Sequence, residues 1–359
     1  MNGSKVAKRE GYVPRGLART GPVLFSYGFR PFFLGAAVWA VVAMTLWIAA
    51  LAGHLEVAGS YGAHAWHAHE MLFGFAPAVL AGFLLTAVPN WTGRLPVSGW
   101  PLAALFALWL AGRAALLSPD VIGIPPAAAI DGLFLPALLL ICAREVIAGR
   151  KWKDLKVLGS LLALSLANAC FHFAVVMGDH PHIAMRLGIS AYVALVTIIG
   201  GRILPSFTVA AFAASLLHTV RLARWRGWRT WPEMLLIILH VAYAFVPLGF
   251  AAIGIGALGF VEEHSVMHVL TVGAIAAMML AVMTRASRGH TGYALTASRL
   301  TAASYAAIVV SALLRPLAEI FPSVAASLYA VSGSAWILAF ALFCAEYGPI
   351  LVRKRRAVQ

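Results

Sequence analysis

Charged side chains are scarce in this sequence. They account for 11% of its 359 residues, whereas hydrophobic residues account for 62% and the mean hydropathy is +0.87. Soluble globular domains carry about 25% charged residues. The shortage therefore excludes an ordinary water-soluble domain and indicates a chain that lies in a lipid bilayer.

Cysteine is also rare. Cys142, Cys170 and Cys344 lie in separate apolar runs, without the paired spacing that is typical of a disulfide framework or of metal ligands. We expect all three to be buried as small hydrophobic side chains.

The alternation of a lipid-facing β-strand is absent. Instead, apolar runs of about 20 residues, long enough to cross about 30 Å of hydrocarbon as helices, recur along the chain. The sequence predicts an all-α polytopic bundle, with one transmembrane domain at 31–350 between a basic cytoplasmic segment at 1–30 and a basic cytoplasmic tail at 351–359. The ten predicted crossings are 31–53, 67–90, 98–117, 124–147, 155–178, 186–204, 233–256, 264–284, 300–320 and 323–347.

The charge distribution predicts the orientation. The chain has 27 lysines and arginines against 13 aspartates and glutamates, a net charge of +14. The basic residues stand in short blocks beside span ends, which indicates membrane orientation and not nucleic-acid binding. Three intervening loops, 54–66, 118–123 and 179–185, hold no lysine or arginine. Because basic loops stay inside, we predict that both termini face the cytoplasm.

The stretch 206–222 is apolar too, so a count of eleven crossings must be weighed. If it crossed independently, the basic cluster after it would lie outside, against the positive-inside rule. This cluster comprises Arg221, Arg224, Arg226 and Arg229. We therefore interpret 206–222 as a continuation of the preceding span, a half-span or an interfacial segment.

Common enzyme motifs are missing. The chain has no P-loop, no Ser-His-Asp order, no paired-carboxylate pattern and no CxxCH haem-attachment motif. Gly254, Gly256 and Gly259 spell GxGxxG, but no strand precedes them. Because the segment ends an apolar helix, we interpret these glycines as helix-packing residues.

A dense group of polar side chains opens the second predicted span. The sequence WHAHEMLFG at 66–74 places His67, His69, Glu70 and Met71 at the start of an apolar run. On a helix His67 and His69 project roughly 200° apart, so we expect them to serve different partners.

Other histidines fall at the same outer depth in distant parts of the chain. His172 lies near the outer end of the fifth span, and His264 and His268 open the eighth. An ionisable group in hydrocarbon costs about 2.5 to 3.5 kcal/mol or more unless it is paired or ligated. Histidines from two helices could bind haem iron axially, and the candidates for this role are His67, His172 and His268.

A further histidine beside Glu70 or Met71 could hold copper. The candidate metal ligands at this level are His67, His69, Glu70, His172, His264 and His268. The simpler interpretation of any one of these histidines is a helix-end side chain bonded to water or backbone.

Two further histidines lie toward the inner side. His240 lies in the inner half of the seventh span, and His290 lies in the cytoplasmic loop RASRGHTG that we expect after the eighth. They could form a second metal site, although a hydrogen bond across helices is a common use of intramembrane histidine and accounts for His240 equally well. We expect the remaining histidines to be solvated: His54, His64, His180, His182 and His218.

Arg113 and Arg315 lie within spans toward the outer side. Haem propionates are anionic and favour guanidinium groups, so both arginines are candidates for cofactor binding. Arg113 also falls at a similar depth to Asp131 on the neighbouring span, and an ion pair between these two is the alternative.

Five long segments stand out along the chain: LFSYGFRPFFLGA (24–36), WHAHEMLFGF with GFLLTAVPNWTG (66–93), GGRILPSFT (200–208), LHVAYAFVPLGF (239–250) and MHVLTVGAIAAMMLAVMTRASRGHTG (267–292). Together they resemble the NnrS family of bacterial membrane proteins, in order and over almost the whole chain. The resemblance implies a multi-pass protein of the bacterial cytoplasmic (inner) membrane that carries haem b and copper and belongs to the response to nitric oxide and nitrosative stress. The matching polar residues here are His67, His69, His172, His240, His268 and His290, with Glu70, Arg202 and Arg285 beside them.

The chain departs from the family pattern at one place. Members of the family have about twelve spans, with a longer apolar stretch between the PSFT and LHVAY motifs, which only 209–238 separates here. Loss of one helical hairpin would preserve an even count of crossings. We expect residues 209–222 to be its remnant.

Our preferred hypothesis is a haem- and copper-binding membrane protein that binds nitric oxide or handles iron-nitrosyl species near the outer face. Reduction of nitric oxide would need a supply of electrons and protons. The sequence shows no cytochrome domain and no acidic proton channel. It therefore leaves enzymatic activity open, and we assign no catalytic residue. The alternative is a polytopic transporter, or a sensory or assembly protein, whose histidines are structural.

Overall fold

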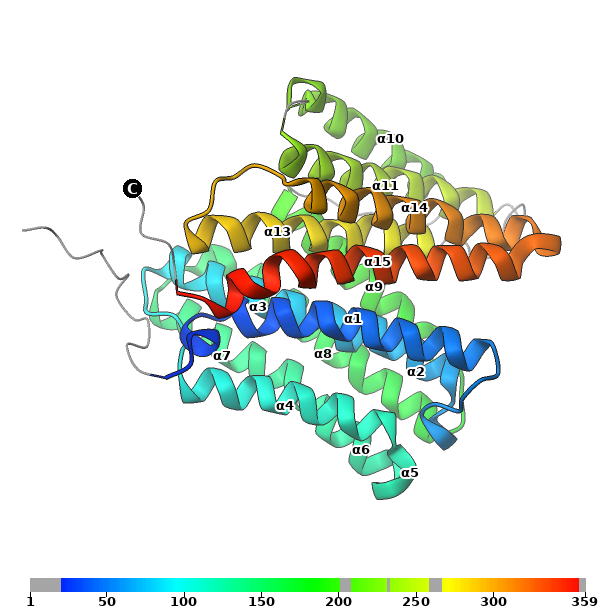
Figure 1. Cartoon of the computed structure of the whole chain (residues 1–359), viewed down its shortest axis with the longest axis horizontal. Coiled ribbons are helices and arrows are strands. Elements are labelled where there is room, and N and C mark those ends of the chain that lie inside the picture. Colours follow the sequence, from blue (N-terminus) through cyan, green and yellow to red (C-terminus); the bar gives the residue numbers. More distant parts are fainter. Residues whose placement is uncertain (1–20, 201–207, 231–232, 258–266, 355–359) are drawn as a thin grey trace, which may run out of the picture.

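The computed structural model describes residues 21–200, 208–230, 233–257 and 267–354, which form helices joined by short turns (Figure 1). No strand occurs among these residues. Nine of their helical segments are long and apolar enough to cross a membrane. The predicted all-α polytopic bundle is confirmed.

These nine segments correspond to nine of the ten predicted crossings, and the shorter apolar helix α9 lies at the position of the sixth. The first half of the chain forms α1 (Phe29–Leu51); a continuous run of α2 (Ala63–His69), η3 (Glu70–Phe75) and α3 (Ala76–Thr92); α4 (Trp100–Leu117); the short α5 (Pro119–Ile122); α6 (Ile124–Gly132) with α7 (Phe134–Ala148); α8 (Leu155–Val176); and α9 (His182–Gly200). The second half forms α10 (Thr208–Arg224), α11 (Met234–Ala257), η6 (Val269–Ala276) with α13 (Ala277–Thr291), α14 (Arg299–Ile320) and α15 (Ala325–Val352).

The second span, from Ala63 to Thr92, is the central helix of the bundle. In its most apolar window 83% of the residues are buried, against 33% to 61% for the other spans. Small residues allow this close packing: the Phe33 ring of α1 lies so near Gly82 of α3 that a Cβ there would overlap it. Side chains of the second span therefore meet protein, not lipid, on almost every side.

Two spans contain a π-helical segment, η3 in the second and η6 in the eighth. Each begins directly after a histidine, His69 and His268 respectively. A π-helical turn holds one more residue than an α-helical turn, and such turns are frequent at functional sites. The fourth span is also interrupted, at Leu133 between α6 and α7.

The first and last described residues lie together at one end of the bundle (Figure 1). Nη1 of Arg30 in α1 donates hydrogen bonds to the carbonyls of Leu351, at 2.6 Å, and Arg353, at 2.7 Å. This contact places the start of the first span beside the end of the last span, which agrees with the predicted even number of crossings. The cytoplasmic orientation of this end stays a prediction.

Helix α10 lies along α11 in the antiparallel direction. The Phe212 ring packs against Gly254 near the end of α11, and the Trp225 ring contacts His240 near its start. α10 is not among the nine long apolar segments found in the described residues. The interpretation of 206–222 as something other than an independent crossing stays a prediction.

Two local predictions are wrong. The segment RASRGHTG is not a loop, because α13 continues through Thr291 and ends only at Gly292, which has a φ of 80°. Arg288 in this segment is paired inside the protein: its Nε donates to the Tyr347 hydroxyl at 3.1 Å. Cys170 is exposed on the outside of α8, whereas Cys142 is buried and Cys344 is partly buried.

Candidate metal centre

His67 and His69 face different partners, as predicted. The His67 ring stacks on Trp47 of α1, with 4.4 Å between ring centroids. His69 is fully buried and points to α8, where Oδ1 of Asn168 lies 2.9 Å from its Nε2. The two histidines therefore belong to two separate groups of polar side chains.

The first group, which we call the metal centre, consists of His69, Asp131 and His172. Oδ2 of Asp131 lies 3.1 Å from Nε2 of His69 and 2.8 Å from Nε2 of His172. All three side chains are buried, and one ligand atom of each lies within 4.8 Å of the other two. Two imidazoles with one carboxylate are a donor set that suits copper, zinc or non-haem iron.

Two further buried charges adjoin the metal centre. The Arg113 guanidinium in α4 pairs with both Asp131 and Glu70. Glu70 also accepts a hydrogen bond of 2.7 Å from Nε1 of Trp39. The ion pair of Arg113 with Asp131, which was one of its two predicted roles, is thus present. If both imidazoles are neutral, the two carboxylates and the one guanidinium give this network a net charge of −1. One further positive charge would make it neutral.

Two glycines make room for the network. A Cβ at Gly112 of α4 would lie 3.0 Å from Cα of Asp131, so glycine lets α6 approach α4 closely. A Cβ at Gly74 would overlap the guanidinium of Arg113 and the carboxylate of Glu70. The Gly74 carbonyl also accepts a hydrogen bond of 2.9 Å from Nε1 of Trp109, which holds α4 against the π-helical segment η3.

Tyr61 connects the metal centre to the loop before the second span. Its hydroxyl lies 3.1 Å from Nδ1 of His172. Burial raises the pKa of the Tyr61 hydroxyl well above its ordinary value; Glu70 adds to this rise and Arg113 opposes it. The hydroxyl therefore stays protonated, and its contact with Nδ1 leaves Nε2 of His172 directed at Asp131.

The second group, which we call the His67 group, consists of His67, His268 and Arg315. Nδ1 of His67 is buried and has no hydrogen-bond partner among the described residues. His268 and Arg315 lie within electrostatic range of the His67 ring. Arg315 donates to Glu319 at 3.0 Å and lies over the Tyr329 ring at 4.3 Å from its centroid. An unpartnered imidazole nitrogen near a guanidinium suits a haem ligand beside a propionate partner.

The other predicted ligands lie apart from these two groups. Nδ1 of His240 in α11 bonds to a backbone carbonyl of its own helix at 2.8 Å. His290 lies at the opposite end of the bundle, where its ring packs against two aromatic rings near the described N-terminal end. Arg285 lies in α13, and His264 and Arg202 lie outside the described residues.

The histidines expected to be solvated are exposed with one exception. His218 is buried, with Nδ1 2.7 Å from the Tyr243 hydroxyl and its ring stacked on Phe250. The prediction for His218 is wrong because this side of α10 packs on α11. The exposed histidines are His54, His64, His180 and His182.

The sequence predicts Asp131 only as a partner of Arg113 and not as a candidate metal ligand. It gives no role to Trp39 and Tyr61, whose polar atoms complete the network. One signal was available: a carboxylate within an apolar span needs several partners, and a single guanidinium leaves some of its lone pairs unsatisfied.

The family model described as "NnrS protein" matches residues 23–212 and residues 209–355. The chain belongs to the NnrS family. The two NnrS matches overlap at 209–212 in α10, within the stretch where a helical hairpin is predicted to be lost. The comparison with curated proteins finds no match. The metal centre lies within the first NnrS match, whereas the His67 group combines residues of both.

Proposed function

We propose that this protein binds haem and copper in the bacterial cytoplasmic membrane and protects against nitric oxide and nitrosative stress. It would bind nitric oxide or handle iron-nitrosyl species near the end of the bundle opposite the described chain ends. NnrS family membership supports this function. The observation that carries it is the buried convergence of His69, Asp131 and His172, which is costly inside a membrane unless the groups are paired or ligated.

A copper ion suits the metal centre. Metal bonds of about 2.0 to 2.2 Å to nitrogen and oxygen place neighbouring ligand atoms about 3 Å apart. The separations of 3.1 and 2.8 Å from Asp131 to His69 and His172 agree with that spacing. Nδ2 of Asn168 donates to Oδ2 of Asp131 at 2.9 Å and, with Arg113, holds the carboxylate in place.

Haem does not suit the metal centre. The rings of His69 and His172 lie only 4.6 Å apart between centroids and face the same carboxylate oxygen, so no macrocycle fits between them. The His67 group suits it better, because Nδ1 of His67 is unpartnered. When bound there, haem would supply an iron that captures nitric oxide. In this assignment His67 or His268 would hold the iron and Arg315 would pair with a propionate.

Metal analysis and optical spectra of the purified protein test both assignments. We expect stoichiometric copper and a Soret band that shifts with nitric oxide. His172→Ala should lose copper and keep the Soret band, whereas His67→Ala should lose the Soret band and keep copper. The exposed His54→Ala is the control and should keep both. A wild-type protein that contains neither cofactor would overturn the proposal.

A transporter, or a sensory or assembly protein with structural histidines, is the alternative function. The observation in its favour is that the metal centre is hydrogen-bonded without an ion: Asn168 bonds both His69 and Asp131, and His172 bonds Asp131. Buried charged residues are also typical of substrate paths in membrane transporters. A colourless, metal-free preparation would favour this alternative.

A further inference from the structure

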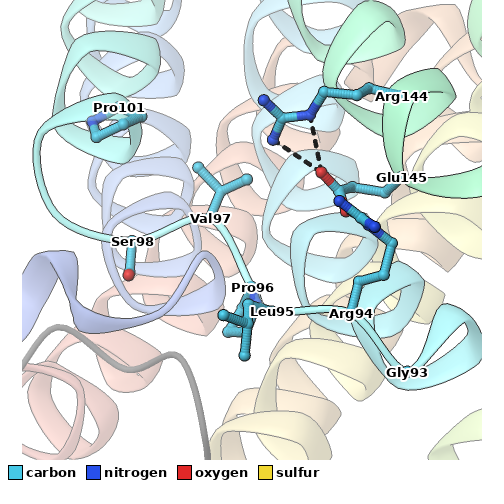
Figure 2. A pocket seen from close by; sticks show the side chains of 9 residues that line it. All are labelled: Gly93, Arg94, Leu95, Pro96, Val97, Ser98, Pro101, Arg144 and Glu145. Carbon is cyan, nitrogen blue, oxygen red and sulfur yellow. Dashed lines mark hydrogen bonds and ion pairs between the residues drawn. The ribbon is translucent and has the colours of Figure 1, made fainter. Parts of the chain in front are cut away.

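We propose that a cleft at the end of the bundle where the described chain ends lie binds the phosphate head group of an anionic phospholipid. The cleft has a volume of about 690 Å³ and lies between the turn that follows α3 and the last turns of α7 (Figure 2). Its polar side is formed by Arg94, Arg144 and Glu145, and its apolar side by Leu95, Val97 and Pro101.

The two arginines are held in place by one nearly buried carboxylate. Nε of Arg94 lies 2.5 Å from Oε2 of Glu145, and Nη2 of Arg144 lies 2.7 Å from Oε1 (Figure 2). The Glu145 side chain is only 6% exposed, whereas those of Arg94 and Arg144 are 44% and 67% exposed. Glu145 thus fixes both guanidinium groups from the inside, and most of their N–H donors stay available for a ligand on the outside.

The charge of this triad fits one phosphodiester. Two guanidinium groups and one carboxylate leave one positive charge, which the single negative charge of a phosphodiester would neutralise. Guanidinium groups bind phosphate oxygens through paired N–H donors. Because Glu145 already holds both arginine side chains in place, they lose less conformational entropy when a phosphate binds.

The depth of the cleft favours a lipid over a soluble anion. Thr92 ends α3, Trp100 begins α4 and Ala148 ends α7, so the cleft lies where three spans end. Trp100 is 88% exposed there, as is typical of tryptophan at the level of lipid head groups. The apolar side of the cleft can contact the glycerol and the first acyl carbons of a lipid. Inorganic phosphate has no such apolar part and would leave this side of the cleft unused.

The surroundings favour an anionic lipid over a zwitterionic one. The loop after α7 lies beside the cleft, because Gly149 packs against Thr92. This loop carries Arg150, Lys151 and Lys153, all of which are exposed. Clusters of basic residues beside span ends attract anionic head groups of the adjacent leaflet.

Lipid titrations of the purified full-length protein in detergent test the site. Native mass spectrometry would count bound lipid and thermal melting would report stabilisation, with phosphatidylglycerol, phosphatidylcholine and inorganic phosphate as ligands. We expect one tightly bound phosphatidylglycerol and a raised melting temperature, with binding of the other two weaker by about tenfold or more. Equal binding of phosphatidylcholine, or of inorganic phosphate, would overturn the proposal.

The variants are designed so that the fold survives. R94Q/R144Q alone would leave Glu145 buried and unpaired, so the informative variant is R94Q/R144Q/E145Q, which removes the whole triad. We expect it to bind phosphatidylglycerol about tenfold more weakly. R299Q is the control, because it makes the same change in net charge at the exposed start of α14, outside the cleft and outside the basic loop after α7. If R299Q weakens binding equally, or the triple variant binds like the wild type, the site is not where we place it.

Discussion

At Asp131, two kinds of interaction meet on one side chain. Oδ1 pairs with Arg113, whereas Oδ2 accepts a hydrogen bond from Asn168 and faces both histidines of the metal centre. Because each oxygen has its own partners, rotation of the carboxylate would break several contacts at once. Asp131 therefore couples the ion pairs of the network to the imidazoles that would hold a metal.

The ion pairs predict a large effect on stability. We expect Arg113→Met to destabilise the protein by about 3 to 5 kcal/mol, because it leaves the buried carboxylates of Glu70 and Asp131 without their cation. Thermal melting in detergent measures this loss. The exposed Arg299→Met is the control, and its effect should stay within about 0.5 kcal/mol.

A second variant separates charge from packing. Glu70→Gln added to Arg113→Met removes one of the two unpaired carboxylates, so the double variant should recover part of the lost melting temperature. If Arg113→Met melts like the wild type, the buried network does not hold the second span against α4 and α6.

Among the helical elements, η3 brings the second span into contact with α4. Its residue Gly74 leaves the space that the side chains of Arg113 and Glu70 occupy. We expect Gly74→Ala to displace this ion pair and to lower the melting temperature, although alanine is the better helix former. Gly159→Ala in α8 is the matched control, because a Cβ there meets nothing within 4 Å. The control should be neutral or slightly stabilising, and a similar result for Gly74→Ala would contradict this account of η3.

The positions of the helices could be predicted from the sequence, but their internal breaks could not. Long apolar runs bounded by polar, glycine and proline residues set the crossings, so the predicted 31–53 is observed as Phe29–Leu51. The π-helical segments and the break at Leu133 depend on packing against neighbouring helices, and hydropathy carries no signal for packing. The end of α13 was missed because Arg288 reads as a loop residue, yet Glu346 of α15 pairs with it at 2.5 Å.

Across the whole molecule, the position of each polar residue along its span could be predicted, but the side chains that it contacts could not. Each histidine and arginine could be placed along its span by counting residues. Which side chains meet depends on how distant helices rotate and pack, and one sequence gives no such information. His69 and His172 were therefore expected as ligands without Asp131, the residue that joins them. Cys170 and His218 were misjudged for the same reason, since exposure depends on which face of a helix packs.

Arg30 joins the start of the first span to the end of the last span, which makes a prediction for the whole fold. Its guanidinium satisfies the carbonyls of Leu351 and Arg353 at the end of α15. We expect Arg30→Met to fray this end, so that backbone amides in the last turn of α15 exchange hydrogen about tenfold faster. Hydrogen exchange with mass spectrometry measures this rate. Exchange at Ser332 and Gly333, in the middle of the same helix, should not change, and acceleration there would indicate global unfolding instead.

The missing positive charge of the network around Asp131 has a consequence for redox chemistry. A cuprous ion at the metal centre would bring the buried charges to zero, whereas a cupric ion would leave one unit in excess. Excess charge in a medium of low polarity is costly, so the electrostatics favour the reduced ion. The carboxylates of Glu70 and Asp131, held in place by Arg113, would in this way set the charge of the ion that the site favours.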